Sequence, residues 1–261
     1  MRILVHAGFH KTGTSSLQSC AAANAELLSP RLNLLLPGDL RPVAQLARSY
    51  EIRPAKRKLK RMRSELDAVL PPPGKPLLIT SEDLSGLVPG RRPGTGYGHA
   101  PDLLHCVGTT LKTRYPDAEI TIWFTTREAE AWMKSIYWQN LRGHRITEDI
   151  DTYRARLSDA LPLEDRVDAV RARLGERARV VSTGIETCRD RAVGPLSAAL
   201  DLLGLPDTEL RPALPVNVRP RDGIETLLRL NRSDLDEDAL ARRKRRYLRR
   251  HSLGQAKRHQ G

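Results

Sequence analysis

A loop bounded by two glycines, close to the start of the chain, most constrains the fold. Ile3–Ala7 has the composition of a short buried strand, and the chain from Thr14 onward has that of a helix. Gly8 and Gly13 therefore bound a turn from strand to helix. In such a turn the first amide groups of the helix lack partners, and the helix dipole favours an anion. The sequence thus predicts an α/β fold with a phosphate site at its first turn.

The rest of the chain alternates short apolar runs with longer amphipathic ones. The predicted strands are Ile3–Ala7, Leu32–Leu36, Leu77–Thr80, Glu119–Phe124 and Ala178–Ser182. The predicted helices are Thr14–Leu28, Arg41–Tyr50, Lys56–Leu70, Asp102–Tyr115, Glu128–Leu141, Ile150–Asp159, Leu163–Leu174, Val193–Leu203, Gly223–Asn231 and Asp236–Arg250. This alternation predicts a three-layer α/β/α fold of the P-loop nucleotide-binding type, with a mostly parallel central sheet and extra C-terminal helices. We expect one domain over residues 1–235 and a basic C-terminal helix or tail over residues 236–261.

The charge of the chain is strongly positive. It has 44 Lys and Arg against 31 Asp and Glu, a formal net charge of +13. Such an excess indicates an anionic partner: a charged nucleotide, an acidic polymer, a membrane surface or nucleic acid. Nine of the cations lie between Arg242 and the C-terminus, where no acidic residue occurs. We favour a solvated terminal helix over a nucleic-acid arm here, and peripheral membrane contact stays open.

Compartment and metal use are predicted from what the sequence lacks. No apolar run approaches the roughly 18–20 residues of a membrane-spanning helix, and the N-terminus lacks the apolar region of a signal peptide, so we expect a cytoplasmic protein. Cys20, Cys106 and Cys188 suit neither a disulfide framework nor a C-x-x-C metal site, and we expect reduced, partly buried thiols. The histidines form no ligand pair, so we expect no metal.

The loop departs from the Walker A motif of nucleoside triphosphatases. Gly8 and Gly13 have the Walker A spacing, but Thr14 follows the second glycine and the lysine lies inside the loop as Lys11. In triphosphatases the lysine after the second glycine reaches the terminal phosphates, and the next Ser or Thr holds Mg²⁺. Lys11 lies instead at the tip of the loop, within the predicted phosphate site.

The stretch GFHKTGTSSL, from Gly8 to Leu17, resembles the 5′-phosphosulfate loop of sulfotransferases that use 3′-phosphoadenosine 5′-phosphosulfate (PAPS). The resemblance is to the bacterial members of this P-loop family. It implies that Lys11 is the catalytic cation. It also implies that the 5′-phosphate and the sulfuryl group are bound by Lys11, Thr12, Gly13, Thr14 and Ser15.

A second segment resembles the 3′-phosphate site of the same family. There an arginine at the end of a strand is followed eight residues later by a serine on the next helix, as Arg127 and Ser135 are here in REAEAWMKSIY. Arginine offers a planar fork for phosphate. The usual proline two residues after the arginine is Ala129, a good helix former. The resemblance is good to about residue 140; beyond it, weaker likeness implies that Asn217 and Arg219 close over the donor.

A carboxylate follows the third predicted strand. Glu82 therefore sits at the carboxyl end of the sheet, where α/β proteins bind ligands, and can accept a proton from an acceptor hydroxyl. Several glycan-type sulfotransferases place a glutamate at the corresponding strand end. A histidine base stays open, with His10 inside the loop and with His99 and His105 beside a Gly-rich segment. That segment, 86–100, is expected to form a lid or acceptor-side loop, with Tyr97 available to stack on a sugar.

Together these residues predict sulfuryl transfer from PAPS to a hydroxyl, with a saccharide or glycoconjugate as the favoured acceptor and no metal. The alternative is a P-loop kinase or nucleotide phosphotransferase that uses Mg-ATP, with Glu82 or Asp83 as the Mg²⁺ ligand. The displaced lysine argues against this alternative. A nucleic-acid or polyanion-binding protein on a degenerate P-loop is a third reading, and we regard nucleic acid as an unfavoured partner.

Overall fold

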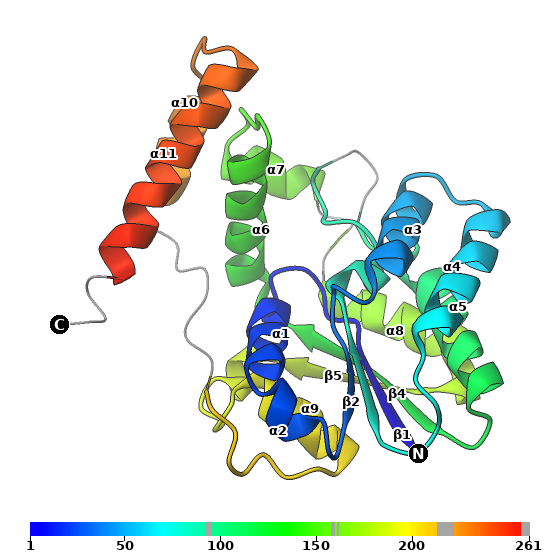
Figure 1. Cartoon of the computed structure of the whole chain (residues 1–261). Coiled ribbons are helices and arrows are strands. Elements are labelled where there is room, and N and C mark those ends of the chain that lie inside the picture. The colour runs from blue at the N-terminus through cyan, green and yellow to red at the C-terminus, as the bar shows by residue number, and fades with distance from the viewer. Residues whose placement is uncertain (92–95, 158–159, 161, 213–221, 257–261) are drawn as a thin grey trace.

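The computed structural model describes residues 1–91, 96–157, 160, 162–212 and 222–256, with only the backbone described for 251–256. Five parallel strands form one sheet in the order β2-β3-β1-β4-β5 (Figure 1). They are β1 (Arg2–His6), β2 (Asn33–Leu35), β3 (Leu77–Thr80), β4 (Glu119–Thr126) and β5 (Arg179–Gly184). Because β1 is central and parallel to its neighbours, the loop after it lies at the carboxyl edge of the sheet.

Helices cover both faces of this sheet (Figure 1). The α-helices are α1 (Thr14–Ala23), α2 (Ala25–Leu28), α3 (Arg41–Ile52), α4 (Lys56–Val69), α5 (Ala100–Arg114), α6 (Ala129–Gly143), α7 (Ile150–Arg156), α8 (Leu163–Leu174), α9 (Pro195–Leu203), α10 (Gly223–Asn231) and α11 (Glu237–Ala256). Short 3₁₀ helices are η1 (Glu82–Ser85), η3 (Gly175–Arg177) and η4 (Ile185–Cys188). Leu4 packs in a core with α1, α2 and α9, whereas Ile3 and Val5 face the core beneath α3, α4, α5 and α8. The predicted three-layer α/β/α fold is confirmed.

One predicted helix is two helices in the structure. The run from Thr14 to Leu28 breaks at Asn24, which is buried and ends α1. Its side-chain amide donates to the backbone oxygen of Arg211 over 2.9 Å and accepts from the Arg211 amide over 2.9 Å. This pairing with a distant segment satisfies the buried amide, and it explains why the chain turns where the local pattern predicts a continuous helix.

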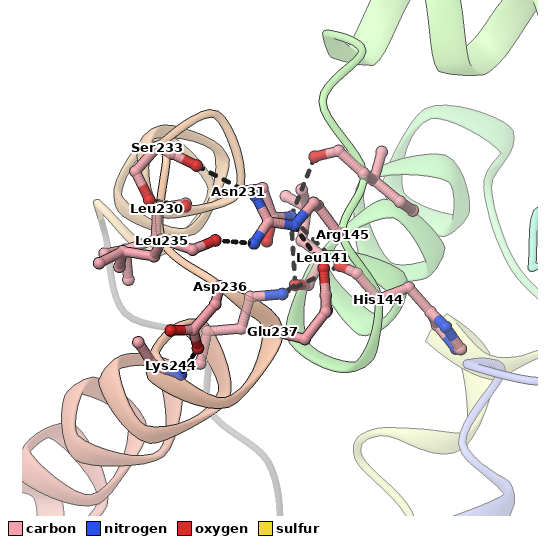
Figure 2. A network of polar contacts seen from close by, with 12 residues as sticks. Leu141, His144, Arg145, Leu230, Asn231, Ser233, Leu235, Asp236, Glu237 and Lys244 are labelled. Carbon is pink, nitrogen blue, oxygen red and sulfur yellow. Dashed lines mark hydrogen bonds and ion pairs between the residues drawn. The ribbon is translucent and has the colours of Figure 1, made fainter.

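The basic C-terminal helix is docked on the body of the protein rather than fully solvated. Lys244 is buried, and its ammonium donates to the backbone oxygens of Leu141 and His144 over 2.8 and 2.9 Å at the end of α6 (Figure 2). Asn231, at the end of α10, donates to the oxygens of His144 and Ile146. The expectation of a solvated helix is therefore wrong for Lys244. It does describe the exposed Arg242, Arg243, Arg245 and Arg246.

The three cysteines are free and buried, as expected. Across the part of the chain that the structure describes, no helix combines the length and apolar character needed to cross a membrane.

Candidate active site

The candidate active site is built on the loop between β1 and α1. Gly13, the N-cap residue of α1, has a left-handed φ of 97°, and Lys11 has a φ of 69°. A Cβ atom on Gly8 would lie 2.6 Å from Thr125 Oγ1 and 2.7 Å from His6 Nε2, so the loop must begin with glycine. Gly13 supplies no side-chain cap. The first amides of α1 are therefore available to an anion.

A chain of buried hydrogen bonds links the loop to strands β1 and β4. His6 Nε2 lies 3.1 Å from Thr125 Oγ1, which lies 2.9 Å from Thr12 Oγ1, and Thr12 Oγ1 donates to the Phe9 oxygen over 2.6 Å. Burial lowers the pKa of His6 to about 3, so its ring is neutral. The hydroxyl of Thr12 is thus directed into the core, away from the cavity described below. This argues against Thr12 as a side-chain ligand for phosphate.

Helix α6 holds the loop from the other side. Trp132 is fully buried and donates from Nε1 to the His10 oxygen over 2.9 Å. Arg127 donates from Nη1 to the Lys11 oxygen over 3.3 Å. Glu128 caps α6 by accepting from the amides of Glu130 and Ala131, each over 2.8 Å. The start of α6 and the loop are therefore fixed to each other at two successive carbonyls.

One cavity of about 580 Å³ brings most of the predicted site residues together. Its lining includes the predicted residues Lys11, Gly13, Thr14, Ser15, Glu82, Arg127 and Ser135. The hydroxyl oxygen of Thr14 is buried and has no hydrogen-bond partner in the described part of the chain. A buried polar atom without a partner is rare in native proteins, and at this position it suits a ligand. Asn217 and Arg219 lie outside the described residues.

The cavity is strongly cationic around Lys11. The pKa of Lys11 is lowered, first by burial and then by the nearby guanidinium groups of Arg142 and Arg127, while Glu82 opposes this shift. Glu82 is half-buried and accepts a hydrogen bond from Gln18 over 2.9 Å. The result is a site with several cations and one carboxylate, Glu82, that forms no ion pair within the described part of the chain. Such a site attracts a ligand of high negative charge.

Asp83, the neighbour of Glu82, is already engaged. Its carboxylate forms an ion pair with Arg48 and lies 3.4 Å from His10 Nε2. The Nδ1 atom of His10 lies 3.1 Å from the hydroxyl of Tyr97. His10 therefore lines the cavity with both ring nitrogens near protein groups, whereas the Glu82 carboxylate accepts one hydrogen bond, from Gln18, among the described residues.

The other acceptor-side predictions are not supported. Tyr97 is wholly buried against Phe9, with ring centroids 4.7 Å apart, so the prediction that it stacks on a sugar is wrong. Its hydroxyl accepts a hydrogen bond from the His10 amide over 3.0 Å, which makes it a support for the loop. His99 packs edge-on against Tyr50, and His105 lies on α5; neither lines the cavity.

Sequence reasoning missed several residues of the cavity. Gln139 and Arg142 lie four and seven positions after Ser135, so the three side chains share one face of α6. The spacing of four and seven residues from Ser135 is enough to predict that these side chains share the site. Arg48 and Arg91 had no such signal, because they reach the cavity from α3 and from the chain after η1.

Comparisons of the chain with family models, with curated proteins and with solved structures found no match. In the residues that the structure describes, no group of three or more His, Cys, Asp or Glu side chains is arranged to hold a metal ion. The interpretation of the site therefore rests on its own residues and their chemistry.

Proposed function

We propose that this chain transfers a sulfuryl group from PAPS to an acceptor hydroxyl, as the sulfotransferases that it resembles do. The observation that carries the proposal is the shared cavity of Lys11, Glu82, Arg127 and Ser135. These residues come from three separate segments of the chain. They supply a cation within the phosphate loop, a carboxylate, and an arginine and serine pair suited to a second phosphate.

The nucleotide would lie along the start of α6. A neighbouring cavity of about 500 Å³ shares Lys11, Arg127 and Ser135 with the first and extends to Trp138. In the proposal the loop amides and the hydroxyls of Thr14 and Ser15 bind the 5′-phosphosulfate. Arg127 and Ser135 bind the 3′-phosphate, where the planar guanidinium matches the phosphate oxygens.

The reaction would be an in-line displacement at sulfur. The acceptor oxygen forms a bond to sulfur while the bond from sulfur to the bridging phosphate oxygen breaks, and 3′-phosphoadenosine 5′-phosphate (PAP) leaves. Glu82 takes the proton of the acceptor hydroxyl. Lys11, together with the field of Arg142, stabilises negative charge that develops on the leaving phosphate. Fixed positions and fixed charges supply most of the acceleration.

The competing phosphotransferase reading has less support. It needs Glu82 or Asp83 as a Mg²⁺ ligand, but Asp83 is held by Arg48, and no lysine follows Gly13. A saccharide hydroxyl as acceptor and a cytoplasmic location stay parts of the proposal.

The test compares turnover of PAPS in the presence of a chelator with turnover of ATP in the presence of Mg²⁺. Incubation with PAPS and a mixture of saccharides should release PAP and label a saccharide with sulfate, and omission of the saccharides should slow the release. Turnover of ATP that requires Mg²⁺, without turnover of PAPS, would assign the chain to the phosphotransferases.

A further inference from the structure

A second groove opens beside the candidate active site. It has a volume of about 680 Å³ and shares Arg48, Leu87 and Arg91 with the catalytic cavity. The remaining lining residues are Gln45, Ser49, Ile52, Arg53, Lys58 and His144. Because the two spaces share three residues, a ligand in the groove would border directly on the catalytic cavity.

Most of the groove lies across β1 from the proposed 3′-phosphate site, and His144 at the end of α6 closes its other side. Arg127 and Ser135, proposed to bind the 3′-phosphate, follow β4, which neighbours β1 on one side. Arg48, Arg53 and Lys58 belong to α3, its end and α4, and α3 packs on η1, which follows β3 on the other side of β1. The groove thus borders the catalytic cavity on the side of β1 away from the proposed 3′-phosphate site, and this leaves it open to the acceptor.

The groove is cationic, and no acidic residue occurs among the described residues that line it. Arg48 is neutralised by Asp83, and Lys58 donates to the backbone oxygens of Ser49 and Arg53 over 2.7 and 2.8 Å. Arg53 and Arg91 form no ion pair with a carboxylate of the described residues, and both are exposed. Among the same residues, the Arg91 guanidinium makes one hydrogen bond, from Nε to Asn140 Oδ1 over 3.3 Å. Neither guanidinium is therefore engaged by a carboxylate of the described residues, and both can contact a ligand.

The same groove has an apolar part. Ile52 is 46% exposed, one of two large apolar side chains with high exposure in the described residues, and it lines the groove with Leu87, which is 8% exposed. Sugar rings present an apolar face of C–H groups beside their hydroxyls. A groove with an apolar patch and charged edges fits such a ring better than it fits a fully charged polymer backbone.

The positive field of the groove also acts on His144. Partial burial of the His144 ring lowers its pKa, and the nearby Arg91 and Lys244 lower this pKa further. Lys244 itself is held at the end of α6 (Figure 2). No carboxylate of the described residues contributes to this lowering of the His144 pKa.

We propose that the acceptor is an anionic saccharide whose charged group is bound by Arg53 and Arg91 while its ring lies on Ile52 and Leu87. This inference rests on the proposed sulfuryl transfer, because it takes the groove as the acceptor side of that reaction. A carboxylate and a sulfate ester present the same pair of oxygens to a guanidinium, so either group satisfies the chemistry.

The test uses three oligosaccharides of equal length on PAP-saturated protein, measured by calorimetry. One alternates a hexuronic acid with a neutral sugar, one is the same compound with each carboxylate reduced to an alcohol, and one is the reduced compound with one sulfate ester per disaccharide. We expect at least one charged compound to bind about tenfold more tightly than the neutral one, and the better of the two identifies the charged group.

Two variants test whether Arg53 causes the preference for charged oligosaccharides. Arg53→Gln changes a residue of the groove that does not line the catalytic cavity. It should remove most of the preference and leave PAP affinity within about twofold. Arg61→Gln, on the exposed surface of α4, removes the same charge elsewhere and should change neither value.

Equal binding of all three compounds, no binding of any, or a full preference in Arg53→Gln would overturn the inference. The separate PAP titration keeps the two proposals apart. If PAP fails to bind wild-type protein while the charged preference persists without nucleotide, the donor assignment fails and the anionic groove stands.

Discussion

Arg127 and Lys11 are joined by a hydrogen bond of 3.3 Å from the Arg127 guanidinium to the Lys11 carbonyl. In the proposed function these two residues contact opposite ends of the donor, the 3′-phosphate and the phosphosulfate. Their direct contact, with the bond from Trp132 to His10, sets the spacing between the two anion sites before any ligand binds. Such preorganisation reduces the cost of ordering the site on binding.

Replacing Lys11 by alanine should reduce turnover more than donor affinity, because the proposed role of its charge is on the leaving group. By analogy with the loss of one electrostatic donor in other active sites, we expect turnover to fall about 10²–10³-fold and PAP affinity less than about tenfold. Lys60→Ala, at an exposed position of α4 outside both cavities, is the control. A defect in affinity alone would refute the catalytic role.

The isosteric change Glu82→Gln should preserve PAP binding and abolish sulfuryl transfer, because the amide cannot take the acceptor proton. Gln18 can still contact the new side chain, so the local structure should persist. Calorimetry and a transfer assay on the same preparation separate the two effects. Transfer at the wild-type rate would move the base to His10, which also lines the cavity.

The alkaline limb of the pH profile should report Lys11. Its charged form is the active one, and its pKa lies below that of an ordinary lysine, so kcat/KM should fall as the pH rises through this lowered value. Arg142 contributes to the lowering. Arg142→Gln should therefore raise the pKa of Lys11 and move the limb to higher pH. An unmoved limb, or the same movement in the control Arg154→Gln, would contradict this reading.

The stability of the fold should depend on His6. Its pKa is about 3 in the folded state and 6.5 in the ordinary state, so between these values the unfolded chain binds a proton that the folded chain does not. The free energy of unfolding should therefore fall as the pH drops from 6.5 toward 3, by up to about 1.4 kcal/mol per pH unit from this group. Urea unfolding of His6→Asn should show a shallower dependence; an unchanged slope would mean that His6 does not titrate in this way.

Much of the fold could be predicted because its signals are local. The strand Leu77–Thr80 and the helix Leu163–Leu174 lie where the sequence predicts them, since their apolar patterns and flanking prolines act over a few residues. The break at Asn24 could not be predicted. It depends on a pairing with Arg211, which lies 187 residues further along the chain.

The candidate site likewise contains residues that a local sequence pattern identifies and contacts that depend on distant segments. Lys11, Thr14 and Arg127 carry sequence patterns that identify them before their positions are known. The inward direction of the Thr12 hydroxyl depends on Thr125, and the burial of Tyr97 depends on Phe9 and His10. These contacts join distant segments and leave no periodic signal in the chain. Residue type alone does not reveal such contacts, which is why the prediction that Tyr97 stacks on a sugar is wrong.

The most direct test of the proposed function is a calorimetric titration with PAP in the absence of metal, beside ADP and Mg-ATP. We predict tight binding of PAP and much weaker binding of the other two. Arg127→Ala should weaken PAP binding by roughly 2–4 kcal/mol and leave ADP binding nearly unchanged, because only PAP carries the 3′-phosphate. Equal affinity for PAP and ADP, or a preference for Mg-ATP, would contradict the assignment of the donor.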